Sequence, residues 1–198
     1  MSQLVATVLL ATAVVLSSSG AQSSPTVVRV VFEAQADSFR AATQEYESIW
    51  RQDGTRIIAA MERRSSLRFM YPLFADTMIR ALVLERASSS GYRDLAPMEL
   101  RASYPVNTKR GTLIHELGHR LMAGLHRRDE EEHEVLFLWL YAVWIDVYGQ
   151  PFADEQVAVE RRRRGPYPQA WDAVTALSAE ERAARWQAVL RERLPTRR

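Results

Sequence analysis

The segment from His126 to Gly149 places the strongest constraint on the fold, because most of it has no polar side. Its first nine residues, HRRDEEEHE, are ionisable, whereas residues 135–145, VLFLWLYAVWI, carry no charge. A helix that is apolar all round is buried on every side in a globular protein. We therefore predict a buried helix that ends at Gly149 and Pro151.

The remaining patterns predict a mainly helical α+β fold with a small sheet. Alternating and β-branched residues indicate strands in TVVRVVFEA (26–34), MIRALVLE (78–85) and APMELRASYP (96–105). Helical spacing of apolar residues predicts helices in 36–52, in 55–67 with Asp53 as the cap, and in 108–125. Three further helices are expected in 153–162, 168–177 and 178–193, the last opened by a Ser178–Glu181 capping box.

The first 21 residues differ from the rest and predict a signal peptide. Thirteen apolar residues, Leu4 to Leu16, are too few to span a bilayer comfortably, and Ser19 and Ala21 supply the small residues that a signal peptidase requires. No lysine or arginine precedes the run. We expect residues 22–198 to form a single exported domain, periplasmic or secreted from a bacterium, without a stable membrane anchor after cleavage.

Composition excludes several kinds of function. Hydrophobic residues make up 47% and charged residues 25% of the 198-residue chain, which is the balance of a globular domain and not of a disordered one. No cysteine is present, so disulfides, thiolate ligands and cysteine nucleophiles are excluded. The arginine run 161–164 lacks interleaved aromatics, which favours a solvated surface and argues against a nucleic-acid partner.

The stretch TLIHELGHRL, residues 112–121, carries the candidate chemistry. Residues four apart on an α-helix lie about 40° apart in projection, so His115 and His119 can present two imidazoles to one metal ion. Glu116 is rotated by about 100° and lies beside that ion without ligating it. A metal lowers the pKa of a bound water, and the carboxylate takes its proton and passes it to the leaving group.

These residues resemble the active-site helix of the HExxH zincin metallopeptidases, and the charged and then apolar helix that follows is similar to that of small single-domain gluzincins. The resemblance covers roughly residues 78–148. It implies that an edge strand, MIRALVLE or APMELRASY, lies along an extended peptide and packs on the HExxH helix. The metzincin variant would need glycine at 122 and histidine at 125, where this chain has Met122 and Leu125.

A catalytic zinc site requires a third protein ligand and one open position. Two residues at the head of the following helix compete for that role: His133 and Glu130. We slightly favour His133, because a histidine at the start of a buried apolar helix needs a partner more than one of four clustered acids does. For Glu131 and Glu132 we favour compensation of the helix dipole, which needs no metal.

The sequence thus predicts a zinc-dependent peptide-bond hydrolase that holds Zn²⁺ with His115, His119 and His133 and uses Glu116 as general base and acid. A peptide or protein is the expected substrate. Two alternatives stay open, a zinc-binding scaffold without catalysis and an envelope interaction protein. A tyrosine or His126 is a candidate to stabilise the oxyanion, and the sequence selects neither.

Overall fold

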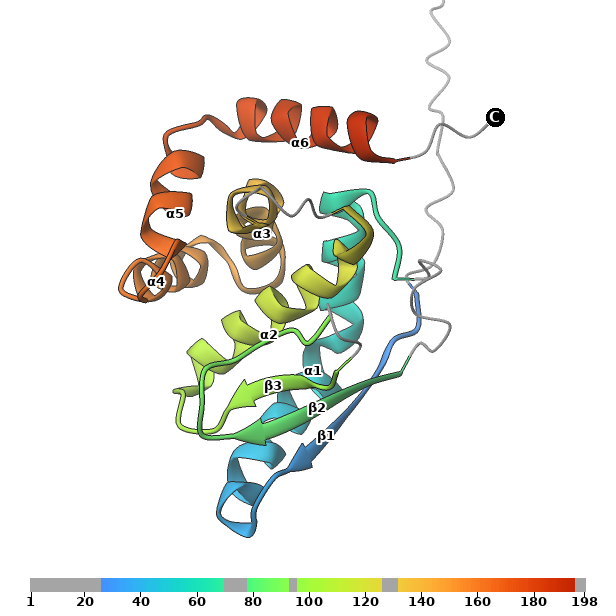
Figure 1. The fold of residues 1–198 in the computed structure, drawn as a ribbon, viewed down its shortest axis with the longest axis vertical. Coiled ribbons are helices and arrows are strands. Elements are labelled where there is room, and N and C mark those ends of the chain that lie inside the picture. The colour runs from blue at the N-terminus through green and yellow to red at the C-terminus, as the bar shows by residue number, and fades with distance from the viewer. Residues whose placement is uncertain (1–25, 70–77, 93–95, 126–131, 195–198) are drawn as a thin grey trace, which may run out of the picture.

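Figure 1 shows the protein as a computed structural model, which describes residues 26–69, 78–92, 96–125 and 132–194. The predicted signal peptide, Glu130 and His126 lie outside the described residues. Within these ranges, three strands and six α-helices follow one another as β1 (Arg29–Ala34), α1 (Arg40–Ser65), β2 (Met78–Leu84), β3 (Met98–Arg101), α2 (Val106–Leu121), α3 (Glu132–Tyr148), α4 (Gln150–Glu160), α5 (Tyr167–Thr175) and α6 (Ala179–Arg193). Short 3-10 turns occupy Asp37–Phe39 and Ala123–Leu125. The prediction of a mainly helical α+β fold is confirmed.

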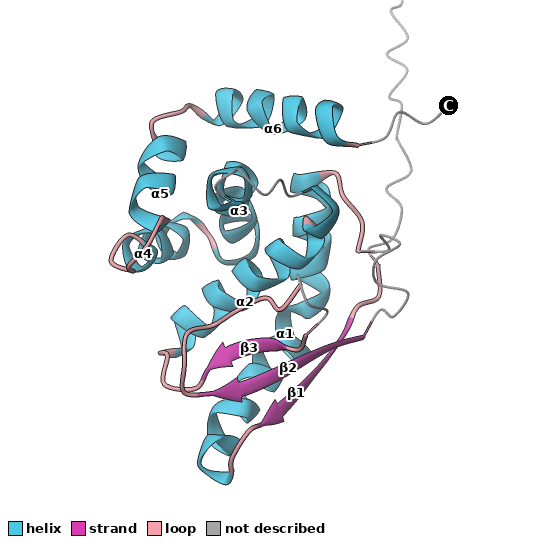
Figure 2. Ribbon diagram, viewed as in Figure 1, coloured by secondary structure: helices cyan, strands magenta, loops and turns pink. Residues whose placement is uncertain are grey.

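The three strands form a parallel sheet in the order β1-β2-β3. Side chains along β2 alternate between buried and exposed at its start, as expected of a strand with one covered face. Helices α1 and α2 lie against this covered face, α1 over β1 and α2 over β3 (Figure 2). MIRALVLE is therefore the central strand, and only the strand in APMELRASY is an edge that packs on the HExxH helix.

One helix boundary was predicted wrongly. The two helices expected on either side of Asp53 are one continuous helix, α1. Asp53 does not cap, because its carboxylate accepts hydrogen bonds from Arg56, one turn later, and from the hydroxyl of Tyr148 on α3. Gly54 continues the helix beneath the Trp50 ring, where an added Cβ would lie 2.9 Å from a ring carbon. Partners on a neighbouring helix thus override the local preference of Asp for helix starts.

Helix α3 is largely buried, as its sequence predicts, and it lies at the centre of the helices. It contacts α1, α2, α4, α5 and α6, and Figure 1 shows it nearly end-on among the helices that surround it. Trp139 and Trp144 are buried, so these two aromatics belong to the core as expected. Gly149, at φ 86°, separates α3 from α4, and the predicted capping box opens α6. No helix in the described ranges has the length and apolar character needed to cross a membrane.

An ion pair between α1 and α3 gives a pH-dependent prediction. Asp146 accepts hydrogen bonds from Arg63 and from two nitrogens of Arg64, and the Arg64 bond holds the pKa of Asp146 below its usual 3.8. A lowered pKa stabilises the fold at pH values above 3.8, and the stabilisation is lost as the pH falls through the folded-state pKa. We expect Asp146→Asn to cost about 1 kcal/mol at pH 7, since both arginines are half-exposed.

Urea unfolding at pH 7 and pH 3 measures this effect, and the difference between variant and wild type should shrink at the lower pH. Asp37→Asn is the matched control, because Asp37 pairs with Arg40 at the open surface and should change nothing measurable. An equal cost of Asp146→Asn at both pH values would contradict the assignment to the charged carboxylate.

Candidate metal centre

The two histidines of the HELGH stretch lie on the buried side of α2. His115 is fully buried and His119 is 6% exposed. Between them, Gly118 allows α3 to approach closely, because a Cβ at this position would lie 2.6 Å from a methyl group of Leu136. This contact places the start of α3 against α2, next to the two imidazoles.

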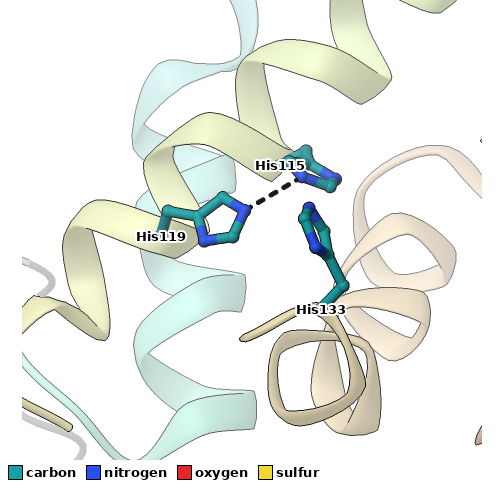
Figure 3. A group of neighbouring side chains, drawn as sticks. All are labelled: His115, His119 and His133. Carbon is teal, nitrogen blue, oxygen red and sulfur yellow. Dashed lines mark hydrogen bonds between the residues drawn. The ribbon is translucent and has the colours of Figure 1, made fainter. Parts of the chain in front are cut away.

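His133, at the start of α3, completes a group of three histidines (Figure 3). The Nε2 atoms of His115 and His119 are 3.1 Å apart, and one ring nitrogen from each of the three histidines lies within 4.8 Å of the others. Tetrahedral coordination at the usual zinc–nitrogen distance of 2.0–2.1 Å separates ligand atoms by about 3.3 Å. The group can therefore hold a metal ion, and its convergent nitrogens fit one.

Carboxylates lie next to the Nδ1 atoms of two of the three histidine rings. Nδ1 of His115 lies 2.9 Å from Oε1 of Glu160, although too obliquely for a hydrogen bond, and Nδ1 of His119 lies 3.5 Å from Oε2 of Glu132. Glu160 is fixed by the indole N–H of Trp171, and Glu132 by the hydroxyl of Tyr92. A carboxylate on the far nitrogen of a metal-binding histidine fixes the ring and raises its basicity.

Sequence reasoning missed both carboxylates. Glu132 was assigned to helix-dipole compensation, but its side chain is nearly buried and points to His119. In the sequence, Glu160 cannot be distinguished from any other acidic residue of an amphipathic helix. It lies next to His115 only because α4 folds back across α3. The position of Glu132, one residue before His133, could have indicated that it lies near the metal-binding histidines. No sequence feature indicates this for Glu160.

Glu116 is buried and lies beside the histidines, but it does not belong to the group of side chains that could hold a metal ion. Burial raises the pKa of Glu116 to about 8, and the charge of Glu160 adds to this rise, while Arg163 and Arg120 oppose it. Without a metal ion this carboxyl therefore mostly keeps its proton at pH 7, despite the two arginines. A divalent cation next to it would favour the charged form.

The arginine run was expected to be a solvated surface, and one of its members contradicts that prediction. Arg163 is largely buried, donates a hydrogen bond to Thr112 of α2, and lies 3.9 Å from the Glu160 carboxylate. Its guanidinium also lies over the Tyr167 ring, 5.3 Å from the centroid. The segment between α4 and α5 therefore turns inward toward the histidines, which brings Tyr167 within 4.4 Å of the His133 ring, centroid to centroid.

A cavity of about 270 Å³ opens beside the histidines. Its wall is polar, and its lining residues are Ser88, Ser89, Ser90, Gly91, Tyr92, Glu116, His119, Glu132, His133 and Tyr167. Thus two of the three histidines, His119 and His133, share one accessible space with Glu116 and two tyrosines, while His115 lies buried behind them.

One wall of the cavity is formed by residues 88–91, which pair with β3 at Ser89 and turn at Gly91. Ser89 forms an antiparallel bridge with Glu99 of β3 through two backbone hydrogen bonds, of 3.0 and 2.7 Å. The segment therefore covers part of the outer side of β3. The strand within APMELRASY is at the edge of the three-stranded sheet, but residues 88–91 lie between it and the cavity.

No family model, curated protein or solved structure matches this chain. The structure brings together His115, His119, His133 and Glu116, whereas Glu130 and His126 lie outside the described residues.

The carboxylates behind the rings give a prediction about metal affinity. Loss of such a partner typically weakens metal binding 10- to 100-fold. We expect Glu132→Gln and Glu160→Gln each to weaken zinc binding by about this factor, measured by competition with a chromophoric chelator. Glu134→Gln is the matched control, because Glu134 lies on the same turn as Glu132 but contacts Arg185. Equal affinities of Glu132→Gln and Glu134→Gln would remove Glu132 from the centre.

Proposed function

We propose that the protein is a zinc-dependent peptide-bond hydrolase of the HExxH zincin type. The proposal depends on one observation, the convergence of three buried or half-buried histidines beside a buried glutamate in an accessible cavity. Three protein ligands with an open side are the donor set of catalytic zinc sites, whereas structural sites use four.

Zinc is the proposed metal because all three donors are imidazoles. Neutral imidazole suits several transition metals, and hard cations such as Mg²⁺ and Ca²⁺ prefer oxygen ligands. Burial lowers the pKa of His115 well below its usual 6.5, so this ring is neutral and ready to bind near pH 7. When bound, zinc would lower the pKa of a water molecule and polarise the substrate carbonyl.

The residues of the chain then have separate roles. Glu116 accepts the proton of the attacking water and delivers it to the leaving amine as the C–N bond breaks. As the water oxygen adds to the carbonyl carbon, the π electrons move to the carbonyl oxygen, which needs a hydrogen-bond donor. Tyr167 is the better donor of the two tyrosines at the cavity, because the Tyr92 hydroxyl donates to Glu132.

A peptide is the proposed substrate because residues 88–91, which pair with β3 at Ser89, form one wall of the cavity. Ser89 uses its N–H and C=O to bind β3, so the backbone groups of its neighbours Ser88 and Ser90 point away from that strand. An extended chain can add to such an edge through backbone hydrogen bonds. The predicted signal peptide places the substrate outside the cytoplasm, in the periplasm or the medium.

The test is metal content together with cleavage. We expect purified protein to bind about one zinc per chain and to cleave an unstructured protein substrate such as casein. Dialysis against a chelator should abolish cleavage, and one equivalent of zinc should restore it. Zinc binding without cleavage of any substrate would favour the non-catalytic scaffold, and absence of zinc binding would favour the interaction protein.

A further inference from the structure

Ser90 is a largely buried residue whose hydroxyl has no assigned task at the metal centre. The residue is 7% exposed and lines the cavity, and its hydroxyl makes no hydrogen bond to any residue that the structure describes. The neighbouring hydroxyls differ in this respect. Ser88 Oγ accepts a hydrogen bond from the backbone N–H of Arg101, and Ser89 Oγ accepts one from that of Gly91.

The backbone on both sides of Ser90 is fixed. Ser89 is bonded to Glu99 through both its N–H and its C=O. Gly91 has φ +64°, and a Cβ there would lie 2.4 Å from the Pro97 carbonyl oxygen, so only glycine fits without a shift. Its carbonyl also accepts a hydrogen bond from Ala96. Ser90 therefore has a preorganised position, and binding need not order it.

Solvent reaches the Ser90 hydroxyl through the cavity, because its oxygen is not among the fully buried side-chain atoms that lack a partner. A ligand that fills the cavity would bury this hydroxyl, and leaving it unpaired would then cost free energy of desolvation that is not recovered. Ligand sites are lined predominantly by hydrophobic and aromatic side chains, with a few placed polar groups that fix specificity. None of the described residues in the cavity wall has an aliphatic side chain, and at about 270 Å³ the cavity lies just below the usual range of about 300–1,000 Å³. Little room remains for a large apolar side chain beside a peptide bond.

We propose that Ser90 selects peptides that carry a small polar side chain, such as that of serine or asparagine, next to the scissile bond. This inference rests on the proposed function. A substrate hydroxyl or amide pairs with Ser90 Oγ, whereas an apolar side chain of equal size leaves that hydroxyl buried and unpaired. A buried group left without its partner corresponds to discrimination of about 10- to 100-fold.

Two peptides test the selection if they differ only in serine or its isostere 2-aminobutyrate beside the scissile bond. Their kcat/KM values are compared for the zinc-loaded wild type, Ser90→Ala and the matched control Ser88→Ala. The affinities of the corresponding serine and aminobutyrate hydroxamates, measured by calorimetry, give a readout that is independent of turnover.

We expect the wild type and Ser88→Ala to prefer the serine compounds by about 10- to 100-fold, and Ser90→Ala to discriminate less than about threefold. Zinc content should be the same in all three proteins. Equal affinity of the wild type for both hydroxamates, or a preference that survives in Ser90→Ala, would overturn the selection by Ser90. A Ser90-dependent hydroxamate preference in a protein that cleaves neither these peptides nor casein would instead support the selection and favour the non-catalytic scaffold over the hydrolase.

Discussion

Replacing Glu116 with glutamine is expected to lower kcat for peptide hydrolysis by about 10²- to 10⁴-fold while one zinc per chain stays bound. Glutamine keeps the shape of the side chain but cannot accept the proton of the attacking water. The ligand atoms belong to His115, His119 and His133, so the substitution leaves the donor set intact. The loss should appear in kcat with little change in KM, because the carboxylate acts in the transition state.

Stability should not account for that loss. Burial raises the pKa of Glu116 to about 8 in the metal-free chain, so a neutral carboxamide replaces a carboxyl that is already mostly neutral at pH 7. We therefore expect the metal-free variant to melt within a few degrees of the wild type, as measured by calorimetry. Full activity in Glu116→Gln would remove this residue from the mechanism, and loss of zinc together with activity would reassign it as a ligand.

Replacing His133 with alanine is expected to weaken zinc binding by at least about 100-fold, since loss of a ligand exceeds the 10- to 100-fold cost of losing its supporting partner. With free zinc at about 1,000 times the wild-type dissociation constant, binding stabilises the wild-type fold by about 4.1 kcal/mol. The same zinc concentration would stabilise His133→Ala by only about 1.4 kcal/mol, because the ratio of zinc to dissociation constant falls to about 10.

Melting temperatures with and without zinc measure this difference. At about 2–4 °C per kcal/mol for a chain of this size, zinc should raise the wild-type midpoint by about 8–16 °C and that of His133→Ala by about 3–6 °C. Glu130→Ala serves as the comparison, because the sequence left Glu130 as the competing ligand. A zinc response that disappears in Glu130→Ala but persists in His133→Ala would make Glu130 the third ligand.

Much of the fold follows from local patterns. The apolar body of α3, the three strands and the helices were predicted at close to their observed positions, because each has a clear periodicity. The helix start predicted at Asp53 was wrong because the Asp53 side chain binds a partner in the tertiary structure, the Tyr148 hydroxyl of α3. Propensities describe one segment at a time and do not include such partners.

The residues of the candidate site likewise differ in whether a local pattern in the sequence could predict them. His115, Glu116 and His119 share one turn and a half of helix, so their spacing alone places two imidazoles and a carboxylate together. His133 was favoured narrowly, because the sequence shows where α3 starts but not how it meets α2. Glu160, Arg163 and Tyr167 lie more than 40 residues along the chain from His115, and no local period connects them to it.

The sequence by itself therefore determined a buried apolar helix, a mainly helical α+β fold and a pair of histidines able to share a metal ion, since each depends on spacing within one element. Only the tertiary structure decided the inward turn of the arginine run, the carboxylates behind the rings and the serine-lined cavity wall. These features depend on how segments far apart in the sequence pack, and that packing follows from the burial of most of α3 among the helices that contact it.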